Sequence, residues 1–498
     1  MNRGCQLRAE QFGSMHIHII AVSGTGMGAL AGLLTELGHQ VSGSDVAFDP
    51  PMGPALERWG VRCLRGFDPR NLEPAPDLVI VGNVCKKDNP EVVATIERGL
   101  NYTHIAGALA EFVLGDTSPL VVAGTHGKTT TTALCAHLLE ACGFAPGFLI
   151  GGLPKNFAHS FRAPKVGKPR LALGDKPTRK PAFVIEGDEY DTAFFEKSAK
   201  FLHYRPEVAI ITSIEHDHVD VYPTLESYLD AFRKFVALVP ESGLIVANAA
   251  DAEVVRAVEA HARATVAWFA LEGENTHGKP PHWLAAPAQF DHEGTRFDLY
   301  AGGVACGRLA LTVPGRHNLK NALAAIGAVA QGYGARIADI GPALAQFQGV
   351  RRRQDLLGSP RGVAVYDDFA HHPTAVHETL SALRARHPSG RLFAVFEPRS
   401  ATACRRMHQA EYAHAFDAAD EVLLAPLGRA NLPPAEALDL DELARDLNAQ
   451  GKPTQKFANV AAIVDYLAPS AATGDTVALL SNGAFGGIHD KLLARLGG

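Results

Sequence analysis

A run from Val121 to Thr131 combines residue types that bind phosphate. It reads Val-Val-Ala-Gly-Thr-His-Gly-Lys-Thr-Thr-Thr, so an apolar strand enters a glycine turn and Gly-Lys-Thr opens a helix. Backbone N–H groups and a helix N-terminus can wrap a phosphate, the lysine adds a positive charge, and the threonine hydroxyl can bind Mg²⁺. A plain strand–helix turn does not explain the lysine and the threonines. We therefore predict a nucleoside triphosphate site at Gly124, Thr125, His126, Gly127, Lys128, Thr129 and Thr130.

Acidic side chains follow the next strand that we predict, Ala182–Glu186. In P-loop folds a carboxylate at such a strand end holds Mg²⁺ directly or through water. Glu186 is the first choice for this ligand. Three acids follow it: Asp188, Glu189 and Asp191. They either contact the metal ligands without binding the metal themselves, or they lie in solvent.

A His-x-His pair, His216 and His218, follows a further predicted strand at Val208–Thr212. The same spacing occurs in metallohydrolases, which is a competing interpretation, although no third and fourth ligand follow with the spacing of a metal site. Two elements after a phosphate loop, His218 is expected to be a ligand of the site rather than a structural histidine.

A second glycine-rich turn lies near the N-terminus. The sequence Ser23-Gly-Thr-Gly-Met-Gly-Ala29 has the G-x-G-x-x-A pattern, and Asp45 ends the following strand. Alone this pattern indicates a Rossmann dinucleotide site with Asp45 on a ribose, but the same device binds any nucleoside diphosphate. A dehydrogenase would not need the downstream P-loop. The candidate contacts are Gly24, Thr25, Gly26, Met27 and Asp45.

Polar residues also end two strands in the last third of the chain. One group is Asp367–Thr374 and the other is Phe396–Ser400. Ligands collect at the carboxyl ends of strands in open α/β sheets, so two such ends in succession predict a binding site. As an alternative, Pro373 and Thr374 simply start a helix and leave His372 exposed.

The elements that must position these residues alternate between short β-rich runs and longer amphipathic stretches, which predicts an α/β fold. The chain has 498 residues, and at about 100–200 residues per domain this length predicts about three domains. The pattern breaks at Gly115–Pro119, which we take as a linker, and restarts near Gly349. The predicted domains are residues 1–117, 118–349 and 350–498.

The individual elements follow from the same pattern. We expect strands at His16–Ala21, Leu78–Val81, Leu120–Ala123, Ala182–Glu186, Val208–Thr212, Gly362–Asp367, Arg391–Phe396, Glu421–Ala425 and Asp475–Ser481. We expect helices at Met27–Leu37, from Lys128 onward, at Leu225–Leu238 and at Asn318–Gln331.

Composition and charge exclude several classes of protein. Hydrophobic residues make up 47% and charged residues 20%, which is typical of a folded chain, and the net charge of −6 provides no basic field for nucleic acid. No apolar run approaches the ~20 residues that span a bilayer, so no membrane partner is expected. Seven scattered cysteines without a CxxC pair favour a reducing, cytoplasmic location.

Together these residues resemble the Mur ligase family of bacterial cell-wall synthesis, from Met15 to the end of the chain. The motifs that carry the resemblance are Gly124–Thr131, Glu186–Asp191, Asp217-His218-x-Asp220, Gly315-Arg316-His317-Asn318 with Asn321, Arg351–Arg353 and Asp367–Thr374. The family fold implies a Rossmann-like N-terminal domain for a UDP sugar, a central P-loop ATPase domain and a Rossmann-like C-terminal domain for the amine substrate. Because Met15-His16-Ile17 looks like the usual family start, residues 1–14 are expected to be an extension.

The resemblance also implies a reaction. The lactyl carboxylate of UDP-N-acetylmuramate takes the γ-phosphate of ATP, and an amine then attacks the acyl phosphate. The implied catalytic residues are Lys128 at the β,γ-phosphates, Glu186, which with Thr129 holds one Mg²⁺, and His218, which holds a second. The implied nucleotide contacts are His317, Asn318 and Asn321 at the adenine, and Arg353 and Asp367 from the third domain. The implied peptide contacts are His371, His372 and Arg399, whose planar fork can bind a carboxylate.

Within the family three stretches favour a tripeptide as the amine substrate. Phe183–Phe195, Glu397–Ser400 and Ser481–His489 resemble the branch that adds L-Ala-γ-D-Glu-meso-diaminopimelate in peptidoglycan recycling. The alternatives are the biosynthetic UDP-N-acetylmuramate–L-alanine ligase, a nucleotide-gated binding protein without turnover, and a metallohydrolase built on the His-x-His pair. The chain departs from the family pattern at Ser213, where asparagine is usual, and at Phe232, where many relatives carry a carbamylated lysine.

Overall fold

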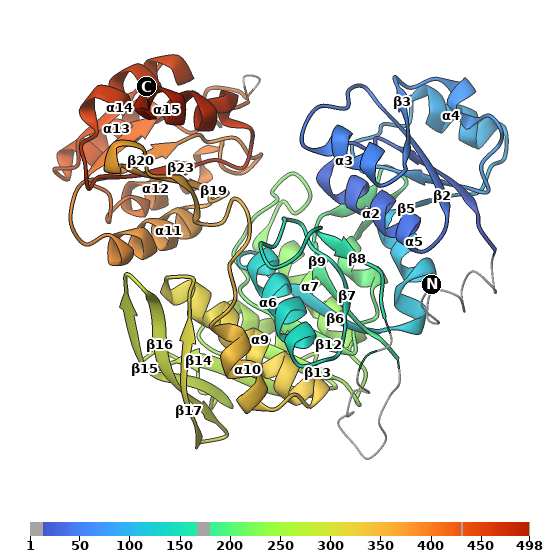
Figure 1. The fold of residues 1–498 in the computed structure, drawn as a ribbon, viewed down its shortest axis with the longest axis horizontal. Coiled ribbons are helices and arrows are strands. Elements are labelled where there is room, and N and C mark those ends of the chain that lie inside the picture. The colour runs from blue at the N-terminus through green and yellow to red at the C-terminus, as the bar shows by residue number, and fades with distance from the viewer. Residues whose placement is uncertain (1–12, 166, 168–179, 430–431, 498) are drawn as a thin grey trace.

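Three large β-sheets flanked by helices, and one two-stranded sheet, make up the described part of the chain, as the computed structural model in Figure 1 shows. The structure describes residues 13–165, 167, 180–429 and 432–497. Residues 1–12 of the predicted N-terminal extension lie outside these ranges. The three sheets follow one another along the sequence, and the predicted α/β class with three domains is confirmed; the exact boundaries at 117/118 and 349/350 stay a prediction.

The N-terminal sheet is entirely parallel, with strand order β3-β2-β1-β4-β5. Its strands are β1 (His16–Ile20), β2 (Gln40–Asp45), β3 (Arg62–Arg65), β4 (Leu78–Val81) and β5 (Tyr102–His104). The helices are α2 (Thr25–Glu36), α3 (Met52–Arg58), α4 (Pro90–Glu97) and α5 (Ile105–Phe112). Helix α2 begins two residues before the predicted start at Met27, because the G-x-G turn itself forms its first turn.

The central sheet has ten strands, in the order β17-β16-β15-β14-β13-β12-β6-β9-β7-β8. The strands are β6 (Ser118–Ala123), β7 (Gly147–Leu149), β8 (Phe161–Arg162), β9 (Ala182–Gly187), β12 (Val208–Ile211), β13 (Leu244–Asn248), β14 (Thr265–Leu271), β15 (Trp283–Asp291), β16 (Gly294–Ala301) and β17 (Val304–Leu311). A separate hairpin joins β10 (Asp191–Ala193) to β11 (Glu196–Ala199). The helices are α6 (Lys128–Ala141), α7 (Leu225–Leu238), α8 (Ala252–Glu259), α9 (Arg316–Tyr333) and α10 (Ile337–Leu344).

The parallel core of this sheet carries the predicted site. Strands β6, β9 and β12 are fully buried along most of their length and pair in parallel, so their carboxyl ends meet at one edge. The predicted linker at Gly115–Pro119 is wrong in its second half. Ser118 and Pro119 belong to β6, since the Ser118 N–H donates to the Pro181 carbonyl and the Pro119 carbonyl accepts from Glu207.

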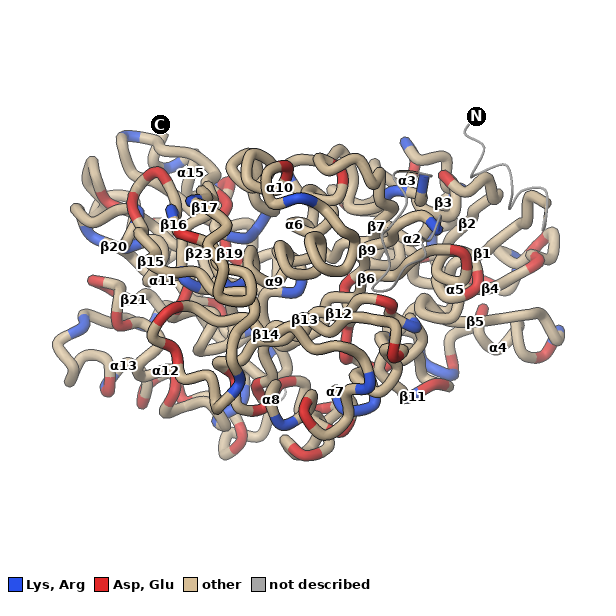
Figure 2. The backbone as a smooth tube through the Cα atoms, turned by 90° about the horizontal axis from the view of Figure 1, so that it is seen from below, with Lys and Arg blue, Asp and Glu red and all other residues tan. Residues whose placement is uncertain are grey.

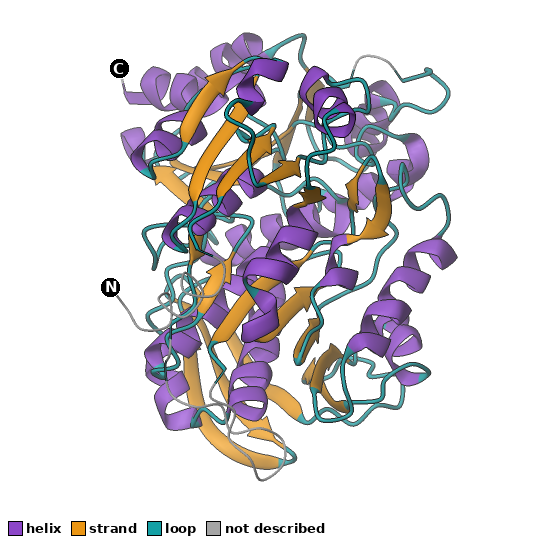
Figure 3. Cartoon of the chain, turned by 90° about the vertical axis from the view of Figure 1, so that its right-hand side faces the viewer, coloured by secondary structure: helices purple, strands orange, loops and turns teal. Residues whose placement is uncertain are grey.

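The C-terminal sheet has six strands in the order β18-β19-β23-β20-β21-β22, parallel except for β18. The strands are β18 (Asp355–Gly358), β19 (Ala364–Asp368), β20 (Leu392–Phe396), β21 (Glu421–Leu424), β22 (Thr454–Lys456) and β23 (Thr476–Leu480). The helices are α11 (Pro373–Arg386), α12 (Gln409–Ala415), α13 (Leu440–Ala449), α14 (Val460–Ser470) and α15 (Ile488–Gly497). Figure 3 shows helices lying against the faces of the sheets.

Charged residues of both signs are interspersed along the whole molecule, as Figure 2 shows. Among the described residues, no helix combines the length and the apolar character required to cross a membrane. The described cysteines, all except Cys5, form no disulfide bond.

Candidate active site

All three domains contribute residues to one large cavity. Its volume is about 1560 Å³, and it lies where the carboxyl ends of the strands face one another. Most of the predicted site residues line it: Gly24, Thr25, Gly26, Met27, Asp45, Thr125, His126, Gly127, Lys128, Thr129, Thr130, Glu186, His218, His317, Asn318, Asn321, Arg353, Asp367, His371 and His372. Gly124 and Arg399 do not belong to this lining. The structure therefore brings the predicted side chains together, while their individual roles stay predictions.

The P-loop connects β6 to α6, and its two glycines are required by close packing. Gly124 and Gly127 have φ of +135° and +80°, and a Cβ on Gly127 would lie 2.4 Å from Oδ1 of Asn321. The backbone N–H of His126 donates to Oγ of Ser213 at 3.1 Å. The serine that departs from the family pattern thus holds the loop in place.

Lys128 opens α6 and points toward buried acids. Its Nζ donates to the Gly124 carbonyl at 2.5 Å and to Oε1 of Glu189 at 2.9 Å. Burial alone would lower the pKa of Lys128, but the Glu189 carboxylate raises it above its usual value. The lysine is therefore charged and lies at the N-terminus of a helix, where an anion binds favourably.

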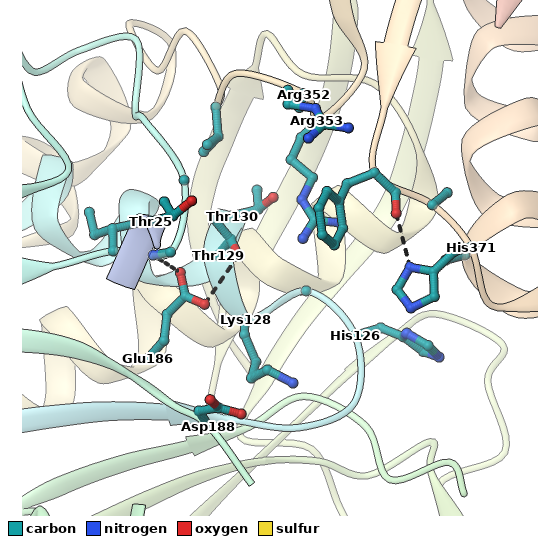
Figure 4. Close-up of a pocket in the computed structure, with 18 of the residues that line it drawn as sticks. Thr25, His126, Lys128, Thr129, Thr130, Glu186, Asp188, Arg352, Arg353 and His371 are labelled. Carbon is teal, nitrogen blue, oxygen red and sulfur yellow. Dashed lines mark hydrogen bonds between the residues drawn. The ribbon is translucent and has the colours of Figure 1, made fainter. Parts of the chain in front are cut away.

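Glu186 lies at the end of β9, beside the first turn of α6, as Figure 4 shows. Its Oε2 accepts a hydrogen bond from the Thr129 hydroxyl at 3.2 Å, and its Oε1 accepts from the Gly151 N–H at 2.6 Å. Burial raises the pKa of this carboxyl, although the Gly151 N–H and Lys128 oppose that rise. A hydroxyl and a carboxylate in contact are hard oxygen ligands of the kind that Mg²⁺ prefers.

Glu189 is fully buried beneath the P-loop. Its Oε1 accepts hydrogen bonds from Lys128, from His218 Nε2 at 3.1 Å and from the Tyr228 hydroxyl at 3.1 Å, whereas its Oε2 has no partner. Burial would raise the pKa of Glu189, but Lys128 and His218 hold it below its ordinary value. The alternative that Glu189 lies in solvent is therefore wrong: the carboxylate is buried behind the cavity lining, where it holds Lys128 and His218.

The two histidines of the His-x-His pair point to different partners. His218 has a left-handed backbone, with φ +53°, and its ring contacts Glu189 and the edge of Tyr190. His216 Nε2 instead pairs with the Tyr222 carbonyl at 2.8 Å. The pair does not converge on one point, which counts against the metallohydrolase interpretation.

The predicted nucleotide contacts from the second and third domains approach each other at the start of α9. His317 Nε2 lies 3.1 Å from Nε2 of Gln354, and the Arg353 guanidinium stacks 4.9 Å from the Phe369 ring centre. Asp367 pairs with Arg352 at 3.2 Å. The motif Arg351–Arg353 contains Arg352, but a role was predicted for Arg353 alone; the Arg352 guanidinium also donates to the Ser481 and Gly483 carbonyls.

In the first domain Asp45 caps the glycine-rich turn. Its Oδ2 accepts from the Ser23 N–H at 2.8 Å, and both the turn and Asp45 line the cavity. Gly28 packs against the Met52 side chain so closely that a Cβ would lie 2.3 Å from the sulfur. The turn is thus fixed against α3 through Gly28, while Gly24–Met27 face the cavity.

The predicted peptide contacts lie in the third domain. His371 Nδ1 pairs with the Phe369 carbonyl at 3.0 Å, and it shares one side of Figure 4 with His126. His372 is buried, so the alternative that it is exposed at a helix start is wrong, although Pro373 does start α11. The Arg399 side chain is 45% exposed and lies 3.7 Å from Glu397.

The second and third domains are joined directly by hydrogen bonds across the cavity. The Thr374 hydroxyl donates to Oε2 of Glu215 at 2.6 Å, and the Thr402 hydroxyl donates to Oδ1 of Asp217 at 2.5 Å. Burial would raise the pKa of Glu215, but the His126 ring lowers it to about 2. Burial lowers the pKa of His372 to about 3.

The sequence signal for Glu189 and Glu215 was present but ambiguous. Both lie in acidic stretches after buried strands, and an acid-rich stretch does not show which carboxylate points inward. Phe232 is fully buried with its ring centre 5.5 Å from that of Phe201, so an aromatic core occupies the position where the resemblance implies a lysine in many relatives.

Comparison with known proteins identifies the family of the chain. Three family models match in order: "Mur ligase family, catalytic domain" over residues 16–117, "Mur ligase middle domain" over residues 122–329 and "Mur ligase, glutamate ligase domain" over residues 352–483. Together these ranges span most of the chain.

Full-length relatives agree with the family models. The chain is 39% identical over 480 residues to the Escherichia coli UDP-N-acetylmuramate–L-alanyl-γ-D-glutamyl-meso-2,6-diaminoheptandioate ligase, covering 96% of this chain and 98% of that protein. It is 37% identical to the Roseiflexus castenholzii UDP-N-acetylmuramate–L-alanine ligase, covering 82% of each. The solved murein peptide ligase of Psychrobacter arcticus superimposes with a TM-score of 0.71 at 34% identity, covering 97% of this chain and 99% of that one. The chain therefore belongs to the Mur ligase family.

Proposed function

We propose that this protein is an ATP-dependent ligase that joins UDP-N-acetylmuramate to L-Ala-γ-D-Glu-meso-diaminopimelate. The observation that carries the proposal is the single cavity in which the P-loop, the glycine-rich turn of the first domain and the strand ends of the third domain face one another. A ligase that activates an acid with ATP and passes it to an amine must bring three ligands to one point. Three domains around one cavity provide the three binding faces.

Transfer of the γ-phosphoryl group requires positioning and charge neutralisation rather than a protein nucleophile. The lactyl carboxylate attacks the γ-phosphorus, giving ADP and an acyl phosphate. Lys128 is fixed at the helix N-terminus by Gly124 and Glu189, so its charge can act on the β,γ-phosphates. Thr125, His126, Gly127 and Thr130 would complete the phosphate cradle.

The residues present fit Mg²⁺, with Thr129 and Glu186 as one ligand pair and His218 for a second ion. The fit rests on the contact between the Thr129 hydroxyl and the Glu186 carboxylate and on the place of both residues, with His218, in the lining of the cavity. When bound, Mg²⁺ would neutralise phosphate charge and polarise the transferred group. The protein's own part is to hold these ligands rigid on β9 and α6.

The second step requires an amine from the third domain. The tripeptide nitrogen would attack the acyl carbon, and phosphate would leave. We assign the peptide to the face formed by His371, His372 and Arg399, whose guanidinium can bind a carboxylate through two parallel hydrogen bonds. Contacts such as Thr374 to Glu215 bring this face against the P-loop domain, and closure would exclude water from the acyl phosphate.

Among the relatives described above, identity and coverage are higher for the tripeptide ligase than for the L-alanine ligase. The test is phosphate release by the purified chain with ATP, Mg²⁺ and UDP-N-acetylmuramate, comparing the tripeptide with free L-alanine. We expect release with the tripeptide and little with L-alanine, and none without the UDP sugar. The reverse preference would establish the L-alanine ligase instead.

A further inference from the structure

Three metal-ligand side chains meet where the second and third domains approach each other. His126 lies in the P-loop, Glu215 follows β12, and His372 immediately precedes α11. One ligand atom from each lies within 4.8 Å of the other two. Within the described part of the chain, no other group of three or more histidine, cysteine or acidic side chains brings its ligand atoms so close together.

The spacing of the ligand atoms suits a small divalent ion. His126 Nε2 is 3.3 Å and His372 Nδ1 is 3.4 Å from the same atom, Oε2 of Glu215. Two atoms bound to Zn²⁺ at about 2.1 Å and at a tetrahedral angle lie about 3.4 Å apart. The two distances to Glu215 therefore already match this geometry, and the two imidazole nitrogens, which lie within 4.8 Å of each other, would complete the third side by moving together.

The surroundings of His372 give a second reason, apart from the spacing, to expect a ligand here. Its side chain is only 7% exposed, and neither of its ring nitrogens makes a hydrogen bond. A buried imidazole without a partner is costly, because it loses its bonds to water and gains none. Its Nδ1 faces Glu215, so a cation between the two would supply the missing partner.

The surroundings also resemble those of a metal ligand. The Thr374 hydroxyl donates to the Glu215 carboxylate at 2.6 Å and fixes its orientation, as outer hydrogen bonds do around metal sites. Glu215 and His126 remain partly exposed to the cavity, with side-chain exposures of 35% and 23%, so an ion has an entry path.

We infer that His126, Glu215 and His372 form a binding site for a divalent transition-metal ion of the Zn²⁺ class. Two imidazoles and one carboxylate favour Zn²⁺ or Co²⁺ over Mg²⁺, which prefers oxygen ligands. The site shares no ligand with the Mg²⁺ positions proposed at Thr129, Glu186 and His218. Because two ligands belong to the second domain and one to the third, a bound ion ties the P-loop to the peptide-binding domain.

The test uses the full-length, tag-free chain with saturating Mg²⁺ and no nucleotide, titrated with Co²⁺ and followed by visible absorption. We expect one Co²⁺ per chain with bands typical of nitrogen and oxygen ligation, and displacement by Zn²⁺. His372→Ala should weaken binding by at least about 100-fold, because the loss of an outer-shell partner alone costs about 10- to 100-fold and His372 is a direct ligand. Glu215→Gln provides a second variant, and circular dichroism confirms that each variant is folded.

His218→Ala and His216→Ala are the matched controls, and both should bind Co²⁺ as the parent does. Absence of binding to the parent chain would overturn the inference. Equal binding by the parent, His372→Ala and Glu215→Gln would overturn it as well. Loss of binding in His218→Ala instead would assign the ion to the Mg²⁺ position. All of these measurements are made without substrate, so they are independent of the proposed ligase activity.

Discussion

Two fully buried glutamates, Glu91 in the N-terminal domain and Glu189 beneath the P-loop, have opposite environments. Glu91 accepts hydrogen bonds on both oxygens: from His18 and Ser44 on Oε2, and from Asn71 and the Asp68 N–H on Oε1. The bond from Asn71 is 2.5 Å long and that from Asp68 is 3.1 Å. Every partner comes from the same domain, so this network is complete without any ligand.

Glu189 collects three donors on one oxygen and leaves the other without a partner. Two of the donors, Lys128 and His218, are themselves predicted site residues. A buried carboxylate with an unused oxygen is costly for folding, unless a ligand completes it. The difference indicates that the Glu91 network stabilises the fold, whereas the Glu189 cluster holds two predicted site residues, Lys128 and His218, in position.

The largest effect should come from Lys128→Ala, which removes the charge that Glu189 positions. We expect the rate of phosphate release to fall by about 1000-fold or more, since one lost donor to a developing anion has an effect of this order. The fold should survive, because His218 and Tyr228 still donate to Glu189. Circular dichroism checks the fold, and a near-parental ligation rate would show that Lys128 does not act on the phosphate.

Glu91→Ala should lower the stability of the protein and leave its rate of phosphate release nearly unchanged. It leaves Ser44, Asn71 and the Asp68 N–H without their acceptor, so we expect the free energy of unfolding to fall by about 3 kcal/mol. The rate at a permissive temperature should change less than about twofold. Calorimetry provides the measurement.

Glu97→Ala is the matched control for this substitution, because Glu97 lies exposed on the same helix, α4. Its effect on stability should stay within about 0.5 kcal/mol. If both substitutions cost the same, burial of Glu91 would not be the source of the stability.

His218→Ala removes the second predicted site residue that donates to Glu189, and so tests the Glu189 cluster separately from Lys128. We expect the rate to fall about 10- to 100-fold, with a higher Mg²⁺ requirement, because a ligand and a partner of Glu189 are both lost. His216→Ala, whose ring faces the Tyr222 carbonyl, should leave the Mg²⁺ dependence unchanged. Superimposable Mg²⁺ titrations of His218→Ala and the parent would remove His218 from the metal site.

A smaller effect concerns pH. Burial would raise the pKa of Glu91, but hydrogen bonds from His18, Ser44 and Asn71 hold it below the ordinary glutamate value of 4.5. A depressed folded-state pKa stabilises the protein above the unfolded value, and this stabilisation is lost as the pH falls through the folded value. The stability difference between the parent and Glu91→Gln should therefore be constant near pH 7 and shift toward the variant below pH 4.5. Thermal melts from pH 7 to pH 3 measure it, and a pH-independent difference would contradict the assignment.

Much of the fold could be predicted because strands and helices here follow local pattern. The helix at Leu225–Leu238 was predicted with its exact bounds, since a Thr224 capping box starts it and its apolar face has a regular period. The start of β6 was misplaced because Pro119 normally ends regular structure. Only the pairing with β9, and the hydrogen bond from the Glu207 N–H to the Pro119 carbonyl, show that Ser118 and Pro119 belong to the strand.

The site was predictable at the level of motifs but not of partners. Glycine turns and strand-end acids identify a phosphate site from spacing alone. Which acid turns inward depends on neighbours far along the chain, as Tyr228 is for Glu189 and Thr374 is for Glu215. Long-range contacts of this kind leave no local pattern in the sequence.

The most direct test of this account is the phosphate-release rate of Glu189→Gln, with Glu91→Gln as its matched control. The two substitutions are chemically identical and both remove one buried charge. We predict that Glu189→Gln loses at least about 100-fold in rate with its melting temperature nearly unchanged, whereas Glu91→Gln keeps its rate within about twofold. Equal rates for the two variants would contradict the claim that the incomplete cluster beneath the P-loop is arranged for catalysis.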